Sequence, residues 1–175
     1  MQIALYRPEI PPNTGNIVRL CVCTGTRLHI VGDPSFSLEE SAVRRAGLDY
    51  WSELDLVRHT DWNAFYESLQ SGAAESASQE NRAGRMYLFS RFAERLYSDV
   101  DYRSDDVLVF GRETSGLPAE VTQSFRERHP DQILRIPVSA RCRSLNLGNA
   151  VALALFEALR QLDFPNLETG APQFS

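Results

Sequence analysis

The chain has 175 residues, of which 43% are hydrophobic and 23% charged, a composition typical of one globular domain with a sizeable core. No charged start leads into an apolar segment, and the longest apolar run, Ala150 to Phe156, is too short to cross a bilayer, so we expect a cytoplasmic protein. The net charge of −5 is unusual for a nucleic-acid-binding protein, although a local basic cluster would be enough to contact phosphates.

The types of side chain exclude several chemistries. All 18 basic residues are arginine, which excludes the phosphate-binding loop that ends in Gly-Lys-Ser/Thr, a Schiff-base lysine and a lysine general base. Cys21 and Cys23 lie two positions apart on an expected helix, so their thiols point to different faces. His29, His59 and His129 have neither a neighbouring nucleophile motif nor metal-ligand spacing. The sequence therefore predicts no metal site and no covalent nucleophile.

Short apolar runs alternate with helical patterns along the chain. Because each run is too apolar to leave one face of a strand in water, the alternation predicts an α/β domain with a largely parallel sheet flanked by helices. Residues 71–84 lack an apolar period and are expected to form an exposed, mobile loop, and residues 163–175 a tail. The expected strands are 2–6, 28–31, 54–57, 86–90, 107–111 and 133–138, and the expected helices are 13–25, 37–47, 61–69, 118–128 and 144–162.

The last expected helix, Ser144 to Leu162, contains a stretch that is apolar all round. Such a helix must be covered on more than one side. The rest of the fold could supply that cover. We favour a partner subunit instead, in a homodimer with this helix at a twofold interface.

A first polar segment, Asn13 to Asn16, follows two prolines and begins a helix. Asn13 is expected to be its N-cap, and the free amides with the positive end of the helix dipole suit a phosphate or another anion. Arg19 lies about one turn from Asn16 on the same face, where its guanidinium could hold a phosphodiester. An ordinary capped helix with a surface arginine is the alternative interpretation.

A second segment follows the strand that ends near Phe110 and contains Gly111, Glu113 and Gly116. The carboxyl edge of a parallel sheet is the usual place for a ligand. The spacing differs from GxGxxG, so a dinucleotide-binding fold is poorly supported, and a plain glycine turn remains the alternative.

A third segment places Ile136 at a strand end and Ser144, Asn146 and Asn149 at the start of the last helix. Plain capping explains one of these polar side chains but not all of them, and the excess indicates a binding site. The three segments are spread over most of the chain, yet each lies beside apolar structure. They predict one composite site.

These motifs occur together with residues 6–16, Tyr-Arg-Pro-Glu-Ile-Pro-Pro-Asn-Thr-Gly-Asn, and residues 44–50, Arg-Arg-Ala-Gly-Leu-Asp-Tyr. Over residues 2–162 the chain resembles the SPOUT (trefoil-knot) RNA 2′-O-methyltransferases, most closely those that modify the wobble nucleotide of tRNA. The resemblance implies one domain, residues 1–162, with a deep C-terminal trefoil knot, and a homodimer that binds S-adenosylmethionine (SAM) without a metal. It also implies, as substrate, the ribose of nucleotide 34 in the anticodon loop of leucine tRNAs.

The same resemblance assigns roles to individual residues. Arg19 is expected to orient the ribose hydroxyl and stabilise negative charge, because an arginine stays protonated and is a poor base. Glu113 is the alternative general base. The residues implied to contact SAM are Phe89, Gly111, Glu113, Gly116, Ile136, Ser144, Leu145 and Asn146, and those implied to contact RNA are Asn13, Asn16, Arg19, Arg44, Arg45 and Arg143.

The chain departs from the family pattern at Gly148, at Phe156 and in the loop that contains Arg91 and Phe92, where close relatives carry serine, tyrosine and a Thr-Thr-Lys-Gly type loop. Two other functions stay open at this point. One is 2′-O-methylation of another tRNA or rRNA position, and the other is a non-catalytic knotted dimer that only binds RNA.

Overall fold

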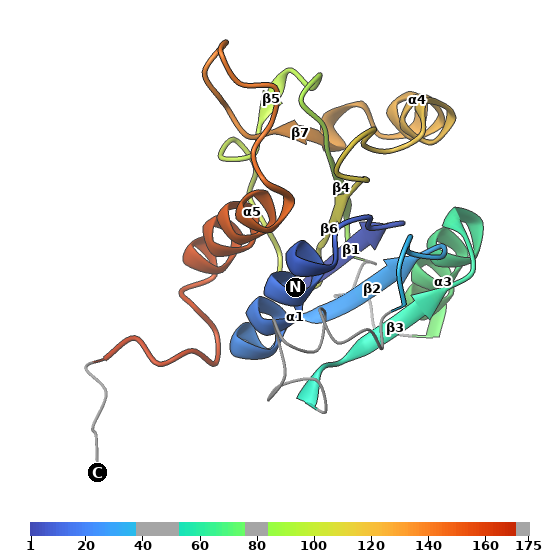
Figure 1. The fold of residues 1–175 in the computed structure, drawn as a ribbon. Coiled ribbons are helices and arrows are strands. Elements are labelled where there is room, and N and C mark those ends of the chain that lie inside the picture. Colours follow the sequence, from blue (N-terminus) through green and yellow to red (C-terminus); the bar gives the residue numbers. More distant parts are fainter. Residues whose placement is uncertain (38–52, 76–83, 171–175) are drawn as a thin grey trace.

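The computed structural model describes residues 1–37, 53–75 and 84–170. Its centre is a seven-stranded parallel sheet with helices on both faces (Figure 1). The strand order is β3-β2-β1-β6-β4-β7-β5, and every strand pair is parallel. The predicted parallel sheet is therefore confirmed. The strands are β1 (Gln2–Tyr6), β2 (Arg27–Val31), β3 (Leu56–His59), β4 (Met86–Phe89), β5 (Arg95–Leu96), β6 (Val107–Phe110) and β7 (Ile133–Arg135).

The helices divide between the two faces of this sheet. Helices α1 (Pro11–Thr24) and α5 (Leu147–Gln161) lie side by side on one face, and α3 (Trp62–Glu75) and α4 (Ala119–Arg128) lie on the other (Figure 1). The helix predicted at residues 37–47 falls, apart from its first residue, outside the described residues. No helix in the described ranges is long and apolar enough to span a membrane.

Alternation along the strands builds two separate core layers. In β1, Ile3 and Leu5 point toward α1 and α5, whereas Ala4 and Tyr6 point toward α3 and α4. Because both faces of each central strand are buried, its sequence is a continuous apolar run. This explains why strand positions could be predicted from the apolar runs in the sequence.

Several predicted boundaries were wrong, and each has a local cause. Helix α1 begins at Pro11, with Ile10 as N-cap and no side-chain cap, because two prolines without N–H groups suit the first turn. Asn13 is therefore not the cap. Gly25, with a φ of 61°, ends the helix as predicted. Helix α3 continues to Glu75, so residues 71–75 are helical and not part of a loop.

The C-terminal elements are shorter than predicted. Strand β7 ends at Arg135, and residues 136–146 leave the sheet as a loop before α5 starts at Leu147. Ser144 and Asn146 thus precede the helix, and Asn146 caps it by accepting a hydrogen bond of 3.3 Å from the backbone N–H of Asn149. Beyond α5, Phe164 and Leu167 pack against the core, so the expected tail begins as ordered structure.

Candidate functional site

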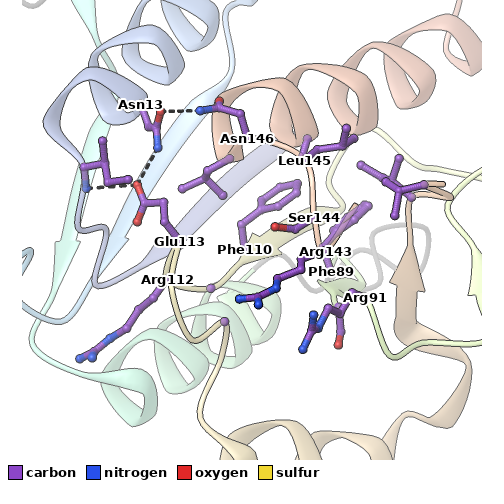
Figure 2. Close-up of a pocket in the computed structure, with 18 residues that line it drawn as sticks. Asn13, Phe89, Arg91, Phe110, Arg112, Glu113, Arg143, Ser144, Leu145 and Asn146 are labelled. Carbon is purple, nitrogen blue, oxygen red and sulfur yellow. Dashed lines mark hydrogen bonds between the residues drawn. The ribbon is translucent and has the colours of Figure 1, made fainter. Parts of the chain in front are cut away.

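The carboxyl ends of β4, β6 and β7 lie at one edge of the sheet, and the loops that follow them surround a cavity of about 410 Å³ (Figure 2). The first turn of α1 and the start of α5 close its remaining side. A volume of this size is within the range of small-molecule and cofactor sites. The edge at which the sequence placed a ligand is therefore the edge that carries a pocket.

The cavity brings together all eight residues that were predicted to contact a cofactor. Of the residues predicted to contact RNA, Asn13 and Arg143 line it, whereas Asn16 and Arg19 are exposed on α1 and do not. Arg44 and Arg45 lie outside the described residues. The cavity-lining residues missed by the sequence reasoning are Ile10, Ser90, Arg91, Phe110, Arg112, Val138, Leu147 and Ala150.

Part of the cavity wall is apolar. The rings of Phe89 and Phe110 stack, with centroids 4.6 Å apart and planes 15° from parallel. Ile136 and Leu145 add aliphatic surface from the loop between β7 and α5. Flat aromatic and aliphatic walls with a few polar groups are typical of pockets that bind a nucleoside-sized ligand.

Asn13 connects the three sequence segments. Its side-chain Nδ2 donates to Oε1 of Glu113 over 3.1 Å, and its Oδ1 accepts from Nδ2 of Asn146 over 2.9 Å (Figure 2). The residue is only 6% exposed. With one partner on each side, its amide has a single satisfactory orientation. Asn13 thus fixes the start of α5 and the loop after β6 relative to α1.

The carboxylate of Glu113 occupies the N-terminal end of α1. Oε2 accepts from the backbone N–H of Glu9 over 2.8 Å, and Oε1 accepts from that of Ile10 over 3.2 Å as well as from Asn13. An anion was predicted to bind at this helix terminus. The anion found there is a side chain of the protein itself, and the amides of Asn13 and Thr14 instead bond to the backbone oxygen of Ile10.

Glu9 makes the reciprocal connection. Its Oε2 accepts from the backbone N–H of Thr114 over 3.1 Å and from Oγ1 of Thr114 over 2.7 Å. The hydroxyl bond, with a smaller contribution from the guanidinium of Arg112, holds the pKa of Glu9 below its usual value. Glu9 and Glu113 thus join the loop before α1 to the loop after β6 from both sides.

Two glycines allow the loop after β6 to fold back on itself. Arg112 and Gly116 exchange two backbone hydrogen bonds, of 3.1 Å and 3.0 Å. Gly116 adopts a φ of 72°, which side chains disfavour, and a Cβ atom at Gly111 would lie 2.2 Å from the carbonyl carbon of Gly116. Of the two glycines predicted from the sequence, Gly111 is thus required by the close approach and Gly116 by its positive φ.

Three arginines, Arg91, Arg112 and Arg143, line the cavity, each from a different loop (Figure 2). Nε of Arg112 is buried and has no hydrogen-bond partner among the described residues. A buried donor of this kind costs free energy unless a ligand or solvent satisfies it. The signal for Arg91 and Arg112 was present in the sequence, because each follows within two residues of a strand that ends at the predicted ligand edge.

A model of the SpoU rRNA methylase family matches residues 1–156. The chain belongs to the SpoU rRNA methylase family. A relative from Methylovorus glucosotrophus, named tRNA (cytidine(34)-2′-O)-methyltransferase, is 44% identical over 163 residues, which are 93% of this chain and 96% of the relative. Nearly the whole chain is thus shared with a family member.

Solved structures of other methyltransferases have the same fold. One, solved to give insight into the 2-OH methylation of C/U34 on tRNA, is 38% identical to this chain. Its TM-score is 0.80, and the match covers 93% of this chain and 95% of the other. An AdoMet-bound rRNA methyltransferase from Sinorhizobium meliloti is 27% identical, with a TM-score of 0.74 over 92% of this chain and 56% of the other. The methylase chain is accordingly an α/β methyltransferase domain of the SPOUT type.

Proposed function

We propose that this methylase transfers a methyl group from SAM to the ribose 2′-oxygen of nucleotide 34 in tRNA, with leucine isoacceptors as the expected substrates. One observation carries the proposal: three segments that are distant in sequence meet at Asn13 and enclose one cavity, in a chain 44% identical to a named C34 methyltransferase. A tRNA-modifying role agrees with the cytoplasmic location expected from the sequence.

The residues around the cavity fit SAM. The stacked rings of Phe89 and Phe110 with Ile136 and Leu145 offer apolar surface for an adenine ring. SAM supplies an electrophilic methyl group on a sulfonium when bound. We assign contacts with it to Phe89, Gly111, Gly116, Ile136, Ser144, Leu145 and Asn146.

The protein's own contribution to methyl transfer is alignment and charge stabilisation. The acceptor hydroxyl must lie in line with the bond that breaks, and it loses one proton as the new bond forms. A guanidinium near that oxygen stabilises the developing negative charge. We assign this role to Arg19, and we assign Glu113 a positioning role because both of its oxygens already accept hydrogen bonds from α1 and the loop before it.

Dimerisation would complete the site. Leu153 and Phe156 are each 45% exposed on α5, and α1 with Arg19 lies beside that helix on the same face of the sheet. We propose a homodimer through α5, with Arg19 serving the cavity of the partner protomer. We also propose that the segment from β7 to α5 forms the family's trefoil knot. The insertion of β7 between β4 and β5 in the sheet supports that threading.

The test is methylation of a defined RNA. The purified methylase is incubated with SAM and unmodified leucine tRNA, and ribose methylation is mapped by mass spectrometry. We expect one added methyl group on the ribose of nucleotide 34. A tRNA with a 2′-deoxy nucleotide at position 34 is the matched control and should accept none.

Two results would contradict the assignment. Methylation at another tRNA position, or of rRNA fragments but not tRNA, would replace the substrate while retaining the chemistry. The second result is binding of SAM and tRNA without any methyl transfer. If transfer is also absent with tRNA that was isolated from a deletion strain and carries its natural base modifications, a non-catalytic RNA-binding dimer is favoured.

A further inference from the structure

Phe92 is the most exposed large apolar side chain in the described part of the chain. It is 72% exposed, whereas the other exposed large apolar residues, Ile10, Val138, Leu153 and Phe156, are 45% exposed or less. A single exposed apolar residue on a surface is common and needs no explanation. The position of Phe92 is what gives it significance, because it directly follows Ser90 and Arg91, which line the cavity.

The turn that carries Phe92 is held by hydrogen bonds. The backbone N–H of Ser90 donates to the oxygen of Leu134 over 2.9 Å, and that of Ala93 donates back to the oxygen of Ser90 over 3.2 Å. The N–H of Phe92 donates to Oγ of Ser90 over 3.3 Å, and Ala93 is buried. The ring is therefore displayed outward by a preformed turn, and a ligand that contacts it orders little additional backbone.

Arg91 occupies one face of the ring. Its guanidinium carbon lies 4.4 Å from the centroid of Phe92, a cation–π distance. Since the residue is still 72% exposed, ring surface not covered by Arg91 faces water. The arrangement is a flat apolar surface backed by a positive charge, and the arginine that supplies this charge, Arg91, lines the cavity (Figure 2).

We propose that Phe92 is a stacking platform for an unpaired base of the substrate RNA, next to the nucleotide whose ribose enters the cavity. The inference rests on the proposed function and adds to it a residue that positions the RNA. RNA-binding proteins recognise single-stranded loops by stacking splayed bases on aromatic rings. Arg91 and Arg143 at the same cavity add positive charge for the neighbouring phosphates.

The experiment compares Phe92→Leu with Phe92→Tyr. Leucine retains apolar surface without a ring, and tyrosine retains the ring. We measure KM and kcat for a leucine tRNA anticodon stem-loop, direct binding of the same RNA, and SAM affinity. Stacking on an aromatic side chain corresponds to a change of about fivefold or more in affinity. We expect Phe92→Leu to raise KM for RNA by at least about fivefold, with SAM affinity unchanged, and Phe92→Tyr to remain within about twofold of the unmodified protein.

The control is Tyr66→Leu. Tyr66 lies on α3, on the face of the sheet opposite α1 and α5. It also has a cation–π neighbour, since the guanidinium carbon of Arg128 lies 5.5 Å from its ring centroid. It does not line the cavity. This variant removes an aromatic ring with a similar neighbour, so KM for RNA should stay unchanged.

Three results would overturn the platform. They are an unchanged KM and RNA affinity in Phe92→Leu, an equal loss in Phe92→Tyr, or a shift in oligomeric state of Phe92→Leu by sedimentation, which would make Phe92 a contact with a second copy. Failure of the unmodified protein to methylate nucleotide 34 would instead refute the proposed function. The direct RNA-binding comparison would still decide whether the ring binds a base.

Discussion

At the scale of single residues, Asn13 is the position on which the geometry of the site depends most. One amide uses its donor on Glu113 and its acceptor on Asn146, so two loops from the C-terminal half are held against the first helix. Alanine at this position removes both hydrogen bonds from a residue that is only 6% exposed, although Glu113 keeps its bonds from Glu9 and Ile10. The cost is therefore larger than the loss of one surface hydrogen bond.

We expect Asn13→Ala to lower the free energy of unfolding by about 1–3 kcal/mol and to weaken SAM binding, because the start of α5 is no longer fixed beside the cavity. Urea denaturation and calorimetry with SAM measure the two effects. Asn63→Ala, an exposed asparagine near the start of α3, is the control and should change neither. Unchanged SAM affinity in a destabilised Asn13→Ala protein would show that the bridge supports the fold but not the pocket.

At the scale of elements, a polar chain crosses three neighbouring strands inside an otherwise apolar sheet. Nε2 of His29 on β2 donates to Oε1 of Gln2 on β1 over 2.7 Å, since the amide oxygen can only accept. Nδ1 of neutral His29 is then an acceptor, and Nε2 of His59 on β3 donates to it over 2.8 Å. The pair links the edge strand β3 to the centre of the sheet.

The hydrogen bonds that join Gln2, His29 and His59 lead us to expect that the stability of the protein depends on pH. Burial, with smaller effects from His59 and Arg27, lowers the pKa of His29 from 6.5 to about 4. Between these values the unfolded chain binds more protons than the folded chain, so stability falls as the pH decreases. The contribution of His29 is complete above pH 6.5 and lost near pH 4, and the change amounts to about 3 kcal/mol.

The measurement is the free energy of unfolding in urea from pH 7 to pH 4.5. His29→Gln should flatten the slope, whatever its effect on stability at pH 7, and His129→Gln, at the end of α4, should retain the slope. Identical slopes for the unmodified protein and His29→Gln would contradict the assignment.

At the scale of the whole molecule, the exposed side of α5 predicts how two copies associate. Val151, Leu155 and Leu159 are buried against the sheet, whereas Leu153 and Phe156, three positions apart, share an exposed face. The core of the chain itself therefore accounts for the apolar residues on one face of α5. We assign the apolar residues on its exposed face to the proposed twofold interface.

We expect Leu153→Glu to convert the proposed dimer into monomers, because a buried unpaired carboxylate at the interface costs several kcal/mol. Light scattering measures the mass. Gln70→Glu places a charge on exposed α3 on the opposite face and should leave the mass unchanged. A monomeric unmodified protein would refute the proposed dimer, and a dimer that persists in Leu153→Glu would place the interface elsewhere.

The same dimer makes a prediction for Arg19. Arg19→Ala should keep SAM affinity and lose methyl transfer by about 100-fold or more, whereas Arg126→Ala on the opposite face should retain activity. Mixing Arg19→Ala protomers with Leu145→Trp protomers, whose cavity is filled, tests the partner's contribution. If Arg19 serves the partner's cavity, an equimolar mixture regains about a quarter of full activity, since about half of its dimers are heterodimers and each of these contains one complete site of two. Full activity in Arg19→Ala alone would remove Arg19 from the mechanism.

By itself the sequence determined the approximate positions of six of the seven strands, those of four helices, and the ligand edge, because apolar runs, prolines and glycines act over a few residues. It therefore predicted both ends of β1, the end of α1 at Gly25, and the two glycines, Gly111 and Gly116, that approach each other in the loop after β6. It missed the two-residue strand β5. It also predicted three polar segments, and each contributes residues to one cavity, although Asn16, Arg19 and Asn149 do not line it.

Only the tertiary structure decided how those segments meet. Asn13 bonds to partners 100 and 133 positions away, and Glu113 reaches the amides before α1 from 104 and 103 positions away. No local pattern distinguishes such a bridging asparagine from a helix cap, since both are polar residues after prolines. Which polar groups satisfy one another depends on the sheet order that places β6 beside β1, and that order is set by packing over the whole chain.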